Sequence, residues 1–154
     1  MLARLGTAVL GLALAAAVLV VPMPAQAATP AQEYAAAAFA TTNKVRANHD
    51  RKTLKSDACL RKAAVRQAKL MAGKGHLFHQ LLGPLLDGCL LMTVGENVAA
   101  GFTSGTVVVR KGWMKSPDHR ANILRKTYTR MGIAARKSED GVWYVAQVFG
   151  RPVL

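Results

Sequence analysis

The chain has 154 residues, of which 51% are hydrophobic and 19% charged, a balance that excludes an intrinsically disordered chain. It carries 21 Lys and Arg residues against 8 Asp and Glu residues, and the formal charge of +13 favours anionic surroundings over a basic partner. The length excludes an assembly of large domains but is sufficient for one domain with its own core.

The first 27 residues have the pattern of a secretory signal peptide. Arg4 precedes an uncharged apolar stretch at 5–21, and Ala25-Gln26-Ala27 is a small-x-small cleavage site. The alternative is an uncleaved membrane anchor, but prolines at 22 and 24 argue against it. We therefore expect residues 1–27 to be a signal peptide and residues 28–154 to be one secreted or envelope-associated domain without a permanent membrane span.

Cys59 and Cys89 are the only cysteines. Because export places both in an oxidising compartment, we expect a disulfide, which would contribute about 3 to 4 kcal/mol in the chain-entropy model. The alternative, a thiol nucleophile or a metal ligand, has neither a Cys-x-x-Cys pair nor a local zinc spacing to support it.

Apolar periodicity and capping residues predict the elements of the domain. Thr29-Pro30-Ala31-Gln32 combines an N-cap, a proline at the first helical position and a capping-box glutamine. Ser56 or Asp57 caps a second helix. In chain order we expect a helix from 30 to about 47, a helix from 56 or 57 to about 73, a loop at 76–93, a short strand at 94–100, a helix at 106–115, a helix opened by Ser116 as its cap, and strands at 131–137 and 142–149.

The last two expected strands form an antiparallel hairpin. Gly141 can supply the positive φ that its tight turn requires. Both faces of the final strand are apolar, so helices should cover the sheet on both sides. These faces are Trp143, Val145 and Phe149 on one side, and Val142, Tyr144 and Val148 on the other.

Three polar residues are the candidates for chemistry: His79, Glu96 and His119. Two imidazoles and a carboxylate can bind a divalent metal such as zinc and leave a position open for water. Their spacing does not by itself bring them together, so a structural role for each is the alternative. At the start of a helix, His119 should stay neutral because the helix dipole opposes its protonation. His49 and His76 are expected at the surface.

Five motifs in order resemble the bacterial branch of the CAP superfamily, the cysteine-rich secretory, antigen 5 and pathogenesis-related 1 proteins. They lie at 43–46, 77–79, 95–98, 113–124 and 147–150, and Gly-Glu-Asn at 95–97 and Ser-Pro-Asp-His-Arg-Ala-Asn-Ile-Leu at 116–124 are the specific ones. The resemblance implies an α+β fold, a three-layer α-β-α sandwich with a central, mainly antiparallel sheet. It also implies a cavity lined by His79, Glu96 and His119. Eukaryotic members add a second glutamate where this chain has Ser116, so we place Ser116 in the cavity and expect no complete tetrad.

Our leading interpretation is a monomeric binding module rather than an enzyme. Its cavity would hold Zn²⁺, another divalent cation or a small ligand, with His79 and His119 as metal ligands, while the basic residues at 44–74 meet an anionic cell-envelope surface. Nucleic acid is not favoured because no aromatic residues alternate with these cations. The alternatives are a metal-dependent hydrolase or protease with Glu96 as general base, a lipid- or sterol-binding protein as among relatives, and a purely structural cluster. The sequence reveals no apolar groove for a lipid.

Overall fold

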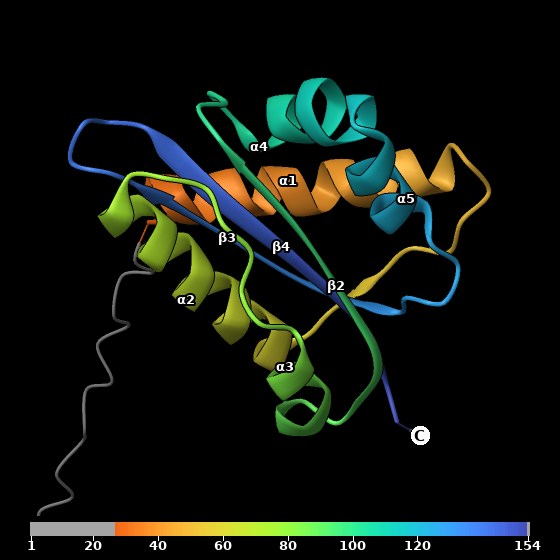
Figure 1. Ribbon diagram of the computed structural model, residues 1–154. Helices are drawn as coiled ribbons and strands as arrows, with labels where there is room; N and C mark the ends of the chain where they lie inside the picture. Colours follow the sequence, from red (N-terminus) through yellow and green to blue (C-terminus); the bar gives the residue numbers. More distant parts are fainter. Residues whose placement is uncertain (1–26, 154) are drawn as a thin grey trace, which may run out of the picture.

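The computed structural model describes residues 27–153, so the expected signal peptide at 1–27 falls almost entirely outside the described residues. Figure 1 shows one sheet with helices on both sides. The elements are α1 (Pro30–Ala47), β1 (Lys55–Ser56), α2 (Ala58–Lys74), α3 (Gly83–Gly88), β2 (Leu91–Ala100), α4 (Gly105–Val107), the π-helical turn η1 (Val108–Gly112), the 3-10 turn η2 (Trp113–Lys115), α5 (Pro117–Leu124), β3 (Arg130–Lys137) and β4 (Trp143–Pro152).

The sheet has the strand order β1-β3-β4-β2. The short β1 runs parallel to β3, and the other neighbours are antiparallel. Helices α2 and α3 cover one face, and α1, α4 and α5 cover the other (Figure 1). The predicted three-layer α-β-α sandwich with a mainly antiparallel sheet is therefore confirmed.

Two apolar clusters, one on each face, hold the layers together. Alternation along β4 assigns its residues to the two clusters, as the sequence predicted. Val145 and Phe149 pack on the side of α1, whereas Tyr144 and Val148 pack on the side of α2. Because β4 is buried on both faces, its side chains contribute to both cores.

The two long helices begin at the residues that their caps dictate. The N-cap Thr29 accepts a hydrogen bond from the Gln32 amide at 3.3 Å, and the Gln32 side chain accepts one from the Thr29 amide at 2.7 Å. For α2, Asp57 rather than Ser56 is the cap, with its Oδ1 3.0 Å from the Leu60 amide nitrogen. The helix then ends at Gly75, whose φ of 70° favours glycine.

Several local predictions were wrong. The segment 76–93 is not a loop throughout, because it contains α3 and the first residues of β2. The segment expected as one helix at 106–115 consists of α4, η1 and η2. Ser116 stands at the cap position of α5, but its side chain makes no capping hydrogen bond. The expected strand at 142–149 begins one residue later and extends to Pro152.

The expected disulfide between Cys59 and Cys89 is present. It joins the first turn of α2 to the residue that follows α3, with 5.7 Å between the Cα atoms. The bond thereby fixes the segment that leads into β2 against the helix behind it. No helix within residues 27–153 is both long enough and apolar enough to cross a membrane.

Candidate functional site

The Gly95-Glu96-Asn97 segment lies in the middle of β2, paired with β4. Gly95 is required because a Cβ there would collide with the hydroxyl of Tyr128, which donates a hydrogen bond to the Val94 carbonyl at 3.2 Å. The side chain of Glu96 is fully buried, and Asn97 is also buried. A central strand thus holds a carboxylate in a fixed position inside the domain.

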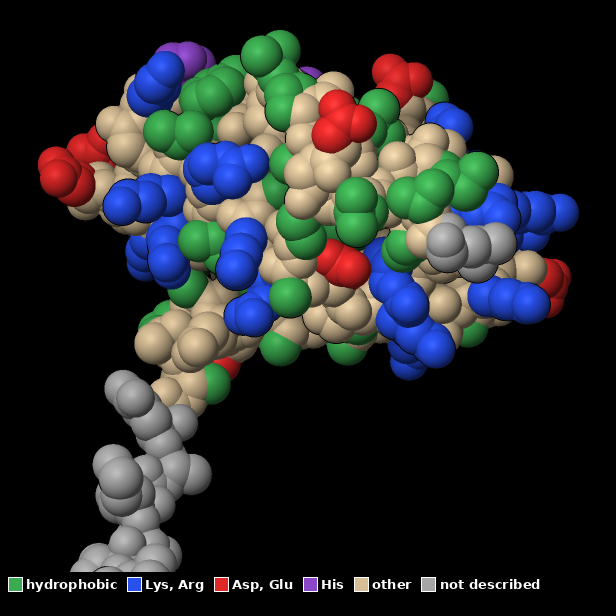
Figure 2. Space-filling view, turned by 90° about the horizontal axis from the view of Figure 1, so that it is seen from below, with side chains coloured by type: hydrophobic (Ala, Val, Ile, Leu, Met, Phe, Trp, Pro, Cys, Tyr) green, Lys and Arg blue, Asp and Glu red, His purple; other side chains and the backbone are tan. Residues whose placement is uncertain are grey.

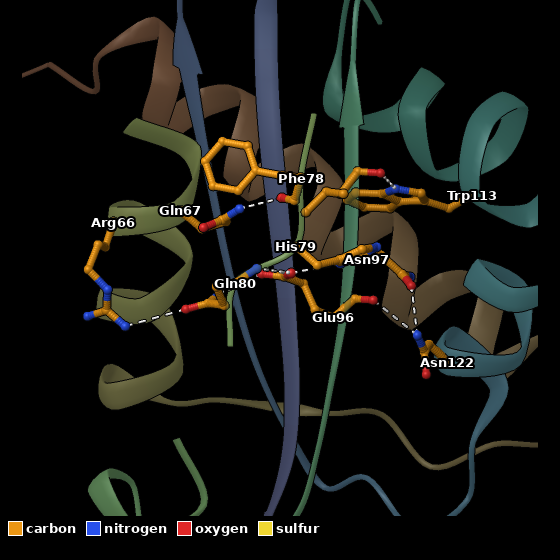
Figure 3. A network of polar contacts seen from close by, with 10 residues as sticks. Arg66, Gln67, Phe78, His79, Gln80, Glu96, Asn97, Trp113 and Asn122 are labelled. Atoms are coloured by element: carbon orange, nitrogen blue, oxygen red, sulfur yellow. Dashed lines mark hydrogen bonds and ion pairs between the residues drawn. The ribbon is translucent and has the colours of Figure 1, made fainter. Parts of the chain in front are cut away.

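Glu96 accepts three hydrogen bonds from the segment that precedes α3 (Figure 3). Its Oε2 lies 2.8 Å from Nδ1 of His79 and 3.2 Å from the amide nitrogen of Gln80. Its Oε1 lies 2.5 Å from Nε2 of Gln80. Because the carboxylate can only accept a hydrogen bond, Nδ1 of His79 is the donor and carries the proton of the neutral ring. The other ring nitrogen, Nε2, is then the acceptor. The His79 side chain is 56% exposed, so this acceptor reaches solvent.

Helix α2 positions the segment that carries His79. The buried Gln67 donates a hydrogen bond to the carbonyl of Phe78, and Arg66 donates one to the side chain of Gln80 at 3.4 Å. Figure 3 shows Arg66 and Gln67 on α2, each with a dashed line to the segment that carries Phe78 and Gln80. The residues on either side of His79 are therefore fixed, although the segment itself is irregular.

Helix α5 is tied to the same strand through amide side chains. Asn122 donates to the Glu96 carbonyl at 3.1 Å and to Oδ1 of Asn97 at 3.0 Å. Asn97 in turn donates to the carbonyl of His119 at 3.1 Å and to Oε1 of Gln147 at 3.0 Å. These bonds place the first turns of α5, and with them His119, next to the Glu96 strand.

His119 has a lowered pKa. Burial is the main cause, the charge of His79 adds to it, and Asp118 opposes it. The expected direction is therefore found, but desolvation rather than a helix dipole is its main cause. A neutral imidazole is the form that can bind a metal.

The other sequence candidates lie outside this network. His49 bonds the Val45 carbonyl and His76 lies beside Phe78, each on the surface side of the fold. Ser116 makes no side-chain hydrogen bond to Glu96 or His79 in the described part of the chain. Within residues 27–153, no three His, Cys, Asp or Glu side chains form a group that could hold a metal ion by themselves.

Two hollows lie elsewhere on the domain. One, of about 660 Å³, is a largely apolar groove between α1 and α2, beside the edge of β3 that β1 leaves uncovered. Such a groove, which the sequence did not reveal, is what the lipid-binding alternative requires. The other, of about 710 Å³, is lined mainly by cations from residues 46–55 and 126–130.

The domain is an α-β-α sandwich, and its central sheet carries a buried glutamate that is hydrogen-bonded to a histidine. This is the architecture of a CAP domain. Residues 39–149 match the model of the cysteine-rich secretory protein family (CAP). The chain belongs to this family, as its motifs predicted.

Three bacterial proteins illustrate the similarity. The chain is 33% identical over 117 residues to the uncharacterized protein YkwD of Bacillus subtilis, an overlap of 71% of this chain and 44% of that protein. An extracellular protein with an SCP domain from Bacillus anthracis has a TM-score of 0.68 at 26% identity, over 82% of this chain and 45% of its own. The chain thus spans less than half the length of both proteins. An outer surface protein of Borrelia burgdorferi has a TM-score of 0.66 at 21% identity, over 75% of this chain and 90% of its own. This similarity shows the fold alone.

Sequence reasoning missed the amide side chains that build the site. Gln80 lies in a segment without a clear pattern, so no local signal identifies it. Gln67 lies on the buried face of α2, and a polar residue at that position of a periodic helix is a signal that could have found it. Asn97, Asn122 and Gln147 lie inside the family motifs, and their position in those motifs is the signal that could have found them.

Proposed function

We propose that this CAP domain acts outside the cytoplasm as a binding module in which His79 and His119 bind a divalent metal ion. The observation that carries the proposal is the hydrogen bond between the buried carboxylate of Glu96 and Nδ1 of His79. A carboxylate behind a histidine fixes the tautomer and the orientation of a metal-binding imidazole. Glu96 then supports a ligand rather than serving as one.

The residues fit a divalent cation with accessible remaining positions. His79 offers an exposed Nε2, and the lowered pKa of His119 keeps its ring neutral at pH 7. Two protein ligands are fewer than the four of a structural zinc site or the three of a catalytic one, so we expect reversible binding. NaASP2, a solved structure at 12% identity and a TM-score of 0.59, was determined with Zn²⁺, which makes zinc the first probe.

Binding is better supported than hydrolysis. The Glu96 carboxylate has no exposed surface and already accepts three hydrogen bonds. A general base needs access to the water whose proton it removes, and this carboxylate lacks that access. The similar protein from B. anthracis is an extracellular protein, which supports a role outside the cell for this domain.

Calorimetric titration of Zn²⁺ tests the proposal directly. We expect saturable binding to the wild-type protein and its loss in the His79→Ala, His119→Ala double variant, with circular dichroism confirming that the variant is folded. The matched control is His49→Ala, His76→Ala, which removes two histidines away from the network and should retain binding. Equal loss in both double variants, or no binding to the wild type, would refute the metal site.

A further inference from the structure

The hollow of about 710 Å³ between the loop after α1 and the segment between α5 and β3 concentrates positive charge. We call it the cationic hollow. Its lining includes six cations and a single carboxylate, that of Asp50. Hydroxyl groups from Thr53, Tyr128 and Thr129 complete its polar surface. The cations are Arg46, Arg51, Lys52, Lys55, Lys126 and Arg130.

The two walls of the cationic hollow come from parts of the sequence about 75 residues apart, and arginines join them. Arg46 donates hydrogen bonds to the carbonyls of Lys52, Ile123 and Arg125 at 2.8, 2.6 and 3.0 Å. Arg51 donates to the Leu124 carbonyl at 3.1 Å. The carbonyls of 123–125 end α5, where a helix favours positive charge. The fold therefore fixes Arg46 and Arg51 between the two walls.

One donor of the buried Arg46 is still available. The residue is only 1% exposed, and its Nε and Nη1 are bonded as described, whereas its Nη2 has no hydrogen-bond partner within residues 27–153. Thr93 Oγ1 is the one described side-chain atom that is both sealed from solvent and without a partner. Nη2 of Arg46 is not sealed in this way, and Arg46 is one of the residues that line the hollow.

The protein does not neutralise this charge. Within residues 27–153, no Lys or Arg nitrogen lies within 4.0 Å of a carboxylate oxygen. Burial lowers the pKa of Arg46, and the charge of Arg51 lowers it further, so the two guanidinium groups repel each other. Figure 2 shows several blue side chains on the right, the side where these loops lie in Figure 1, with a red side chain at the edge among them. A bound anion would relieve this repulsion.

We propose that the cationic hollow is a binding site for the phosphate groups of a polyanionic ligand. Guanidinium groups, ammonium groups and hydroxyls are the donors that phosphate oxygens accept from, and a planar guanidinium matches their geometry. The hollow is large enough for more than one phosphate group. The site goes beyond the proposed function, since it shares no residue with the His79–Glu96 cluster.

The test is calorimetric titration of inorganic tripolyphosphate into the full chain at constant ionic strength, with amide shifts in NMR spectra to locate the site. We expect saturable binding with the largest shifts at 52–55 and 126–130. In the Lys52→Gln, Lys126→Gln variant, affinity should fall about tenfold or more, because each lost charge-assisted contact has an effect of that size. Both lysines are exposed, so the variant should fold.

The matched control is Lys62→Gln, Lys69→Gln, which removes the same charge from exposed positions on α2 and should change affinity less than about threefold. The His79→Ala, His119→Ala variant should bind tripolyphosphate normally, which separates this site from the metal site. Equal losses in the two lysine variants, equally tight binding of citrate, or no saturable binding to the wild type would overturn the proposal.

A short glycerol phosphate oligomer distinguishes the source of the phosphate. Tighter binding of the oligomer than of tripolyphosphate, with the same dependence on Lys52 and Lys126, identifies a phosphate polymer. Binding of tripolyphosphate alone identifies a small phosphorylated ligand. Either result supports phosphate recognition by the cationic hollow.

Discussion

The two ionisable clusters of this domain are built in opposite ways. At Glu96, one buried carboxylate accepts three hydrogen bonds from His79 and Gln80, so the protein itself satisfies this group. In the cationic hollow, six cations surround Asp50 and none of them forms an ion pair with it. The first cluster orients a side chain, whereas the second lacks a partner. The comparison indicates that an anionic ligand is best sought where the fold leaves charge uncompensated.

Removing Arg46 should have the largest effect on stability. In Arg46→Ala, three carbonyls lose their donor and a cavity forms, so we expect a loss of about 4 kcal/mol in the free energy of unfolding. Urea denaturation measures this loss. The exposed neighbour Lys44 is the control, and Lys44→Ala should stay within about 0.5 kcal/mol of the wild type. A loss below about 1 kcal/mol in Arg46→Ala would mean that this residue does not hold the hollow together.

Replacing Glu96 should have an intermediate effect. Glu96→Ala leaves the donors of His79 and Gln80 without an acceptor, and we expect a loss of about 2 to 3 kcal/mol. Glu96→Gln keeps one acceptor oxygen and should lose less. Urea denaturation of both, with the exposed Glu139→Ala as control, compares a satisfied carboxylate with a solvated one. Equal stability of all three variants would show that the hydrogen bonds accepted by Glu96 do not stabilise the fold.

The pH dependence of His119 should be the smallest effect. Its pKa is lowered in the folded protein, so stability is unaffected by this group above pH 6.5, where the ring is neutral in both states. As the pH falls below 6.5, the unfolded chain binds the proton first and stability decreases until the folded ring also titrates. NMR titration should give a midpoint below 6.5, and His119→Asn should flatten this part of the stability profile. A midpoint above 6.5 would contradict the burial described here.

Local signals in the sequence were sufficient where the structure is local. The capping box at Thr29 and Gln32 fixed the start of α1, and Gly141 has the positive φ of 81° that the hairpin needs. The predicted helix at 106–115 changes type partway along because close packing intervenes. Gly105 packs against the backbone of Tyr34, and Gly112 packs against the ring of Phe102. Such contacts depend on the tertiary fold and leave no periodic pattern.

The candidate site was predictable only in part. His79, Glu96 and His119 could be named from chemistry and from the family motifs, but their spacing did not place them together. The bond between Glu96 and His79 requires α2 to hold the intervening segment, a long-range contact. The basic residues at 44–74 were predicted to meet an anionic surface, and they include four of the six cations of the cationic hollow. Its other wall was missed, because Arg46 and Lys126 come from distant segments that meet only in the fold.

The strand order has a consequence for the timing of folding. The central strand β4 follows every other strand of the described sheet along the chain, yet within residues 27–153 it is the only long neighbour of both β2 and β3. Neither strand can complete its ladder on a growing chain until residues 143–152 have emerged. The sheet therefore assembles only after β4 has been synthesised, and until then the edges of β2 and β3 that pair with β4 lack their partner.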